Sequence, residues 1–262
     1  MHRLSIIGGG RMGDALLGGL LSAGWARPDE LCVVEASAAR RDELTALRPG
    51  VAVLAEPGPA EAAVVAVKPA DVDAATRAAA GAGAHRILSI AAGVTIARLE
   101  DAAGTGIPIV RAMPNTPALV GAGASAIAGG THASPEDLDW AESVLGSVGI
   151  VVRVGEAQLD AVTGLSGSGP AYVFLVVEAL VEGGVLAGLP RDVASALAHQ
   201  TVLGAGRLLA EGAEGPEALR AAVTSPGGTT AAGLRALESA AVRSAVIDAV
   251  VAATERSREL GG

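Results

Sequence analysis

The chain has 262 residues, a formal net charge of −9 and a sequence pI near 5.0. This acidic balance, with no stretch rich in Lys and Arg, argues against a nucleic-acid partner, because binding to phosphates depends on clustered basic residues. Hydrophobic residues make up 50% of the chain and aromatic residues only 2%, so a core must be built mainly from Val, Leu, Ile and Ala.

The sequence predicts no metal site, no disulfide and no exported or membrane segment. Cys32 is the single cysteine, and the four histidines lack the spacing of metal ligands. A glycine-rich stretch begins too soon after the amino terminus for a secretory signal, so we expect a cytoplasmic protein. The longest stretch without charged residues, 112–135, contains Pro114 and Pro117, which argues against a membrane helix.

The first 22 residues have the pattern of a dinucleotide-binding fold. An apolar run, 4–7, leads into glycines and then into leucines at helical spacing. Gly8, Gly10 and Gly13 match GxGxxG, in which the glycines permit a tight turn, close approach of a pyrophosphate and packing of helix on strand. A tight turn without a ligand is the alternative. We expect the coenzyme-binding loop to consist of Gly8, Gly9, Gly10, Arg11, Met12 and Gly13.

The next apolar run, 31–34, ends at Glu35, where dinucleotide folds place an acid that binds the ribose 2′-hydroxyl of NAD. Ser37, Arg40 and Arg41 follow, and such groups can hold the 2′-phosphate of NADP. A solvated helix face is the alternative for the two arginines. Taken together, these residues slightly favour NADPH over NADH as the coenzyme.

Apolar runs alternate with helical stretches as far as residue 155, which indicates a parallel sheet covered on both faces. The further strands are expected at 51–54, 62–67, 86–90, 107–113, 124–128 and 150–154. Lys68 with Pro69, and Ala91 with Ala92, lie at carboxyl ends of strands, where open α/β sheets bind ligands. Asn115 is either a polar contact in the same cleft or simply a turn-forming residue.

From residue 156 the strand pattern stops, which places a domain boundary there. Helices are expected over 157–163, 170–187, 191–210, 216–223, 229–239 and 242–259. Two breaks rich in glycine and hydroxyl residues, 166–170 and 224–230, each precede a helix. Backbone N–H groups of such a loop can bind a carboxylate or phosphate, and capping of the helix by Ser or Thr is the alternative.

Over essentially its whole length, the chain resembles the pyrroline-5-carboxylate reductase family. The segments that carry the resemblance are GGGRMG (8–13), AVKP (66–69), AAGVT (91–95), RAMPNTP (111–117), LSGSGPAY (165–172) and SPGGTT (225–230). The first of these is common to many dinucleotide-binding proteins, whereas the last two in this order are highly specific.

The resemblance implies an α/β fold: an N-terminal Rossmann-type dinucleotide-binding domain, 1–155, followed by an all-helical C-terminal dimerisation domain, 156–262. It implies an oxidoreductase in which NAD(P)H reduces the C=N bond of 1-pyrroline-5-carboxylate to L-proline. It further implies a homodimer of interleaved helices that complete the active site, with further assembly left open. Glycines that permit close helix contact fit such a dimer, namely Gly183, Gly184, Gly204 and Gly206.

Roles for single residues also follow from the resemblance. Ser225 and the amides of Gly228 and Thr229 would bind the substrate carboxylate, with Gly227 in the same loop. Thr230 would hydrogen-bond the ring nitrogen as the catalytic residue. Besides the glycine-rich loop, the expected coenzyme-binding residues are Glu35, Ser37, Arg40, Ala66, Val67, Lys68, Pro69, Ala91, Ala92 and Asn115.

Two departures from the family pattern and two other functions bear on this interpretation. Ala222 stands where some members have Asn, and Glu35 where many have a small or hydroxyl residue. A 3-hydroxyacid dehydrogenase of similar architecture would need a Lys in the helical domain as general base, but no Lys follows Lys68. A non-catalytic NADP-binding regulator is disfavoured by the intact loops in both halves.

Overall fold

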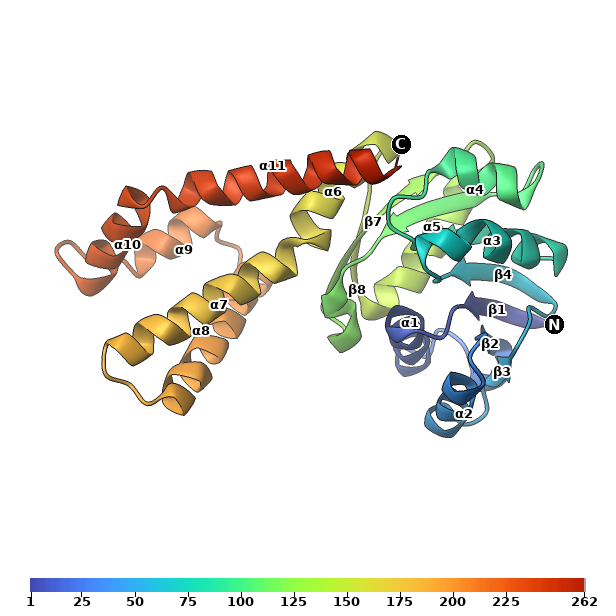
Figure 1. Ribbon diagram of the computed structural model, residues 1–262, viewed down its shortest axis with the longest axis horizontal. Coiled ribbons are helices and arrows are strands. Elements are labelled where there is room, and N and C mark those ends of the chain that lie inside the picture. Colours follow the sequence, from blue (N-terminus) through green and yellow to red (C-terminus); the bar gives the residue numbers. More distant parts are fainter. Residues whose placement is uncertain (262) are drawn as a thin grey trace. The chain divides into compact units, whose positions relative to one another are not determined.

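The computed structural model describes residues 1–261 and divides the chain into two compact units (Figure 1). The Rossmann unit comprises Met1–Ser168 together with the residues from Val251 onward, and the helical unit comprises Gly169–Val250. This division differs from the boundary at 155 and 156 that the sequence suggested. Leu159 packs in one buried cluster with Ala126 and Ala128, so the segment after residue 155 still belongs to the Rossmann unit.

The Rossmann unit is built on an eight-stranded sheet with strand order β3-β2-β1-β4-β5-β6-β7-β8. Its strands are β1 (His2–Ile7), β2 (Leu31–Val34), β3 (Ala52–Leu54), β4 (Ala60–Val65), β5 (Ile87–Ser89), β6 (Ile109–Met113), β7 (Gly123–Gly129) and β8 (Gly149–Arg153). The sheet is parallel, as the sequence predicts, except at one pair, because β6 and β7 are antiparallel. Only residues 114–122 connect them, which is too short for the crossover that a parallel pair needs.

Helices cover both faces of this sheet. They are α1 (Arg11–Ser22), α2 (Ala38–Leu47), α3 (Val72–Gly81), α4 (Ile96–Ala103), α5 (Pro135–Leu145) and the short α6 (Leu159–Val162). Side chains alternate between the faces of a strand, so Leu4 and Ile6 of β1 join Leu16 of α1 in one core cluster. Ile7 joins Val72 of α3 in a second cluster on the other face.

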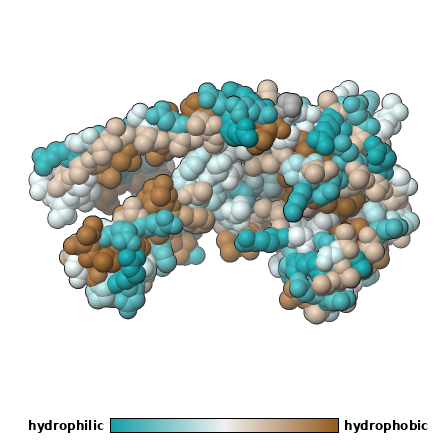
Figure 2. Space-filling model, viewed as in Figure 1, coloured by the Kyte–Doolittle hydropathy of each residue, from teal (hydrophilic) through white to brown (hydrophobic). Residues whose placement is uncertain are grey.

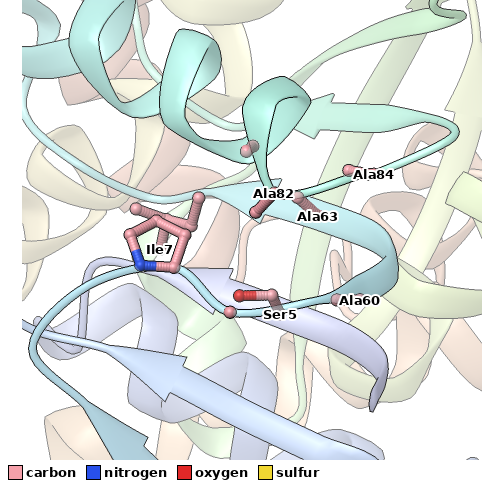
Figure 3. Close-up of a pocket in the computed structure, with 9 residues that line it drawn as sticks. Ser5, Ile7, Ala60, Ala63, Ala82 and Ala84 are labelled. Carbon is pink, nitrogen blue, oxygen red and sulfur yellow. The ribbon is translucent and has the colours of Figure 1, made fainter. Parts of the chain in front are cut away.

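Small side chains leave a narrow gap between β1, β4 and the end of α3. Figure 3 shows Ser5 and Ile7 on one side of it, with Ala60, Ala63, Ala82 and Ala84 around it. The gap is too narrow to admit a water molecule. It is therefore a packing defect in the second core cluster.

The helical unit has little core of its own. Its helices are α7 (Gly169–Leu186), α8 (Arg191–Glu211), α9 (Pro216–Ala222), α10 (Thr229–Ser239) and the first turns of α11 (Val242–Gly261), whose last turns belong to the Rossmann unit. In residues 169–250, all of which the structure describes, the buried hydrophobic residues are Val181, Ala194 and Ala198. Most apolar side chains of this unit are exposed in the single chain.

Candidate functional site

A cleft of about 610 Å³ opens at the carboxyl ends of β1, β2 and β4. In the strand order, β1 lies between β2 and β4, so the chain adds strands on one side of β1 and then on the other. Open α/β sheets bind ligands at such a reversal of strand order. The structure brings several predicted coenzyme-binding residues together in its lining, namely Gly8, Gly10, Glu35, Ala66, Val67 and Lys68.

The three positions of the loop carry glycine for different structural reasons. Gly8 has φ +110°, and a Cβ there would lie 2.5 Å from the carbonyl oxygen of Ala66. A Cβ at Gly13 would lie 2.0 Å from the Gly8 carbonyl oxygen, so α1 can approach the loop only because residue 13 has no side chain. Gly10, by contrast, has open space at its Cβ position. Gly10 is therefore the glycine that leaves the cleft accessible.

The start of α1 fits the diphosphate of a dinucleotide. Gly10 is the N-cap and provides no side-chain hydrogen bond to the first turn. The N–H groups of that turn and the positive end of the helix dipole are thus available to an anion. Lys68 is exposed and lines the same cleft, and no ion pair of Lys68 is found in the part of the chain that the structure describes.

Glu35 is held by two backbone donors at the end of β2. The N–H of Gly9 donates to Oε2 at 3.0 Å, and the N–H of Ser37 donates to Oε1 at 2.9 Å. The Ser37 hydroxyl in turn accepts from the N–H of Arg40 at 3.4 Å and so caps α2. The carboxylate is fixed in the lining of the cleft, between the glycine-rich loop and the start of α2.

Arg40 and Arg41 point to partners within the protein and do not line the cleft. The Arg40 Nε donates to the Gly9 carbonyl oxygen at 2.8 Å, and its other nitrogens bind Glu43 and Asp14. The hydrogen bond to Glu43 raises the pKa of Arg40 above its usual value, and the negative charge of Asp14 raises it as well. Desolvation lowers this pKa, but by less than the hydrogen bond to Glu43 raises it. Arg11 and Met12 also lie outside the lining.

A second hollow, of about 390 Å³, lies in the Rossmann unit beside the turn after β5. Pro69 and Ala92, two of the expected coenzyme-binding residues, line it, whereas Ala91 is buried and does not. The sequence did not predict the contribution of α11, whose Ser257 lines the hollow and donates to Asp160 at 2.7 Å. No local signal marks a contact between residues so far apart in the chain.

Asn115 forms a structural bridge. Its Oδ1 accepts from the N–H of Ala124 at 2.8 Å, and its Nδ2 donates to the carbonyl oxygen of Ser166 at 3.0 Å. The residue is 9% exposed. These contacts match the alternative in which Asn115 organises a turn, since both ends of the amide bind protein groups.

In the helical unit, the predicted carboxylate loop forms the turn before α10. Gly227 adopts a left-handed conformation, with φ +70°. The N–H of Gly228 donates to the carbonyl oxygen of Ser225 at 3.1 Å, so this amide is used inside the turn and not left open as the sequence suggested. A Cβ at Gly228 would lie 2.4 Å from the Ser225 Oγ. Gly228 caps α10 without a side-chain bond, which leaves the N–H of Thr229 at an open helix N-terminus.

Two further properties bear on ligands and environment. Within residues 1–261, no group of three or more His, Cys, Asp or Glu residues is placed to hold a metal ion. The helical stretch Glu156–Leu186 is long and apolar enough to cross a membrane by length and composition, and it lies outside 112–135, the stretch that lacks charged residues. Only 6% of the most apolar 18 residues in this stretch are buried in the single chain, so its apolar surface needs another molecule to cover it.

Comparison with known proteins covers both units. Residues 156–260 match the family described as pyrroline-5-carboxylate reductase dimerisation, and residues 3–93 match the family described as NADP oxidoreductase coenzyme F420-dependent. The pyrroline-5-carboxylate reductase of Synechocystis is 48% identical over 99% of this chain and 98% of its own length.

Solved structures agree along the whole chain. The pyrroline-5-carboxylate reductase of Coxiella burnetii matches with a TM-score of 0.93 and 36% identity, over 100% of this chain and 99% of that one. The Plasmodium falciparum pyrroline carboxylate reductase, solved with NADP bound, matches with a TM-score of 0.85 and 30% identity, over 100% and 98% of the two chains. The chain therefore belongs to the pyrroline-5-carboxylate reductase family.

Proposed function

We propose a division of roles between the two units for the reduction of 1-pyrroline-5-carboxylate to L-proline, the activity that membership of this family gives to the chain. The Rossmann unit binds NAD(P)H, and the loop 225–230 of the helical unit binds the carboxylate of the imine. The observation that carries this proposal is a pair of helix N-termini, α1 and α10, each preceded by glycine and each without a side-chain cap.

The cleft at β1, β2 and β4 supplies the groups that a dinucleotide needs. The first turn of α1 offers N–H groups to the diphosphate, Glu35 offers carboxylate oxygens to a ribose hydroxyl, and Lys68 offers a positive charge. When bound, NAD(P)H supplies the hydride that adds to the imine carbon. Pro69 and Ala92, at the turns beyond β4 and β5, provide small apolar surface in the neighbouring hollow.

The loop before α10 supplies groups suited to a carboxylate. The Ser225 hydroxyl and the N–H of Thr229 are its donors, because the Gly228 N–H is already used within the turn. Gly227 permits the left-handed bend, and Gly228 leaves room for the Ser225 hydroxyl. A carboxylate here is further stabilised by the positive end of the α10 dipole.

Thr230 follows as the second residue of α10 and is half-buried. Electron density moves onto the imine nitrogen as the hydride adds, so a hydrogen bond to that nitrogen stabilises the transition state. A Thr hydroxyl can donate or relay a proton but is not a strong acid. The proton itself comes from solvent or from substrate that is already protonated.

Three variants of this loop test these roles. Thr230→Val should lower kcat about ten- to a thousandfold, as expected for one lost transition-state hydrogen bond, with little change in coenzyme affinity. Ser225→Ala should mainly raise the KM for the imine. Thr229→Val is the matched control, because it retains the backbone N–H on which the proposal depends. If kcat of Thr230→Val stayed within about twofold of the parent while Ser225→Ala still weakened binding, a water would replace Thr230 as donor.

We also propose that the helical units of two chains form a homodimer, consistent with the dimerisation family that this part of the chain matches. Figure 2 shows hydrophobic residues gathered over α7 and α8, where Phe174, Leu175 and Leu197 are exposed. Exposed apolar surface of this extent is typical of an interface. Further assembly stays open. The cytoplasmic location stays a prediction that cell fractionation can check.

The preference for NADPH over NADH is a separate prediction, and it depends on Ser37, Arg40 and Arg41. All three make hydrogen bonds within the protein in this structure. Their availability to a 2′-phosphate is therefore reduced, and a preference for NADPH loses its main support.

A further inference from the structure

Glu35 is the fixed acceptor at the end of β2. Its two carboxylate oxygens accept from Gly9 and Ser37, at 3.0 and 2.9 Å, so movement of the side chain would break at least one of these bonds. Each carboxylate oxygen can accept more than one hydrogen bond, so acceptor positions remain for a ligand in the cleft that Glu35 lines. A donor hydroxyl fits this arrangement.

We infer that Glu35 makes this enzyme select NADH over NADPH, an inference that rests on the coenzyme site proposed above. The ribose 2′-hydroxyl of NADH can donate a hydrogen bond to the carboxylate. The corresponding phosphate of NADPH has about −1.5 to −2 charges at neutral pH and would face the carboxylate as a like charge. Like charges that meet in a binding site disfavour the complex strongly.

The charge of Arg40 is already paired with acids of the protein. Arg40 uses Nε on the Gly9 carbonyl oxygen and its two terminal nitrogens on Glu43 and Asp14. Asp14 is also bound by Arg48 at 2.8 Å, so release of Arg40 would disturb a network of ion pairs. Arg40 therefore acts as a positioning residue that holds the glycine-rich loop.

Arg41 is likewise directed back to the backbone. One of its terminal nitrogens donates to the carbonyl oxygens of Glu35 and Ala36, both at 2.8 Å. The Ser37 hydroxyl is used as the cap of α2. The Ser37 hydroxyl, the Arg40 guanidinium and one terminal nitrogen of Arg41 thus support Glu35 and its loop.

The remaining charges of the cleft agree with this inference. Lys68 lines the cleft from the carboxyl end of β4, whereas Glu35 follows β2 on the other side of β1. Asp71 also lines the cleft and, like Lys68, follows β4 and not β2. Lys68 and Glu35 therefore follow strands on opposite sides of β1, and we assign Lys68 to the diphosphate and not to the 2′-phosphate.

Equilibrium binding of NADH and of NADPH to the purified enzyme, without imine, tests the inference directly. We expect the Kd for NADH to be lower by about 10- to 100-fold. Glu35→Gln removes the charge and keeps one carbonyl oxygen, and it should shift the ratio of the two Kd values towards NADPH by about tenfold or more. Asp71→Asn is the matched control, since it removes the other acid of the cleft and should change the ratio by less than about twofold.

Arg40→Ala separates positioning from phosphate binding. Loss of the contact to Gly9 should weaken both coenzymes to a similar extent, whereas a phosphate-binding role would weaken NADPH far more. Equal Kd values in the parent enzyme, tighter NADPH, or an equal effect of Glu35→Gln on both coenzymes would overturn the inference. If Glu35→Gln did not fold, the ratio of the two Kd values in the parent enzyme would still test the inference. Failure to reduce the imine with either coenzyme, with the Kd ratio intact, would refute the proposed roles in catalysis and leave this inference standing.

Discussion

Replacement of Gly13 by Ala should destabilise the Rossmann unit because the new methyl group meets backbone. Its Cβ would lie 2.0 Å from the Gly8 carbonyl oxygen and 3.3 Å from Cγ2 of Ile6, where ordinary contacts begin near 3.4 Å. The Gly8 carbonyl cannot swing aside as a flexible side chain would. Gly8 is itself confined, since it has φ +110° and lies against the Ala66 carbonyl oxygen. The first turn of α1 must therefore move away from β1.

The magnitude follows from two opposing effects. Overpacking in a well-packed site costs about 1–3 kcal/mol, and the severe approach to backbone places this site near the upper end. Ala is better than Gly inside a helix by about 1 kcal/mol, which offsets part of the cost. The free energy of unfolding should therefore fall by about 2 kcal/mol, which corresponds to a decrease in Tm of about 4–8 °C for a domain of this size.

Gly10→Ala is the matched control three residues earlier. No atom lies within 4 Å of its Cβ position, and its φ of −70° suits any residue. A small loss at the N-cap and a small gain from the less flexible unfolded chain nearly cancel, so the Tm should change by about 2 °C or less. The methyl group would, however, occupy the open approach to α1 and raise the Kd for both coenzymes about tenfold or more.

Thermal unfolding at one protein concentration and coenzyme titration separate the two variants. Gly13→Ala should lose stability, and Gly10→Ala should lose coenzyme affinity at nearly unchanged stability. A Tm of Gly13→Ala within about 1 °C of the parent would refute the reasoning from the backbone contact. An equal loss of stability in Gly10→Ala and Gly13→Ala would refute it as well.

Two further predictions concern assembly and pH. Phe174 is 62% exposed on α7, and Phe174→Glu should prevent association of the helical units in sedimentation; Leu47→Glu, at 59% exposure on α2, should leave the oligomeric state unchanged and serves as control. Burial raises the pKa of the Cys32 thiol above its ordinary value of 9.0, with a smaller opposing effect of Ser5. The folded state thus disfavours the thiolate, so this contribution to the free energy of unfolding is complete below about pH 9 and is lost as pH rises further. In urea titrations between about pH 8 and 10, the free energy of unfolding should fall more steeply with pH for the parent than for Cys32→Ala. Equal slopes against pH would contradict this assignment.

The strands of the Rossmann unit could be predicted because a buried strand leaves an apolar run in the sequence. The run 31–34 coincides with β2, and the run 62–67 overlaps β4 (Ala60–Val65). An apolar run indicates a strand buried on both faces, which is typical of a parallel sheet, but it does not give the direction of one particular strand. The reversal between β6 and β7 was therefore not predicted, although the short connection after β6 is present in the sequence.

The coenzyme site, too, could be predicted only in part from the sequence. The glycine-rich loop is recognisable because the spacing of Gly8, Gly10 and Gly13 is itself a local pattern, although the carbonyl oxygen of Ala66 that Gly8 approaches belongs to a distant segment. The partners of Arg40 could not be predicted, because Gly9 and Asp14 lie 31 and 26 residues away along the chain. An arginine near a predicted phosphate site has the same sequence signature whether it binds the ligand or supports the loop beneath it.

The helical unit buries too few apolar side chains within one chain to account for its folding. α7 is apolar on most of its surface, a pattern expected of a helix that is buried all round, yet Val181 is its one buried residue within the described chain. Three small or medium side chains cannot offset the conformational entropy of ordering residues 169–250. In the proposed dimer the missing burial comes from the second chain. Folding of this unit and association are then one process, so its stability depends on protein concentration and cannot be assigned to the monomer.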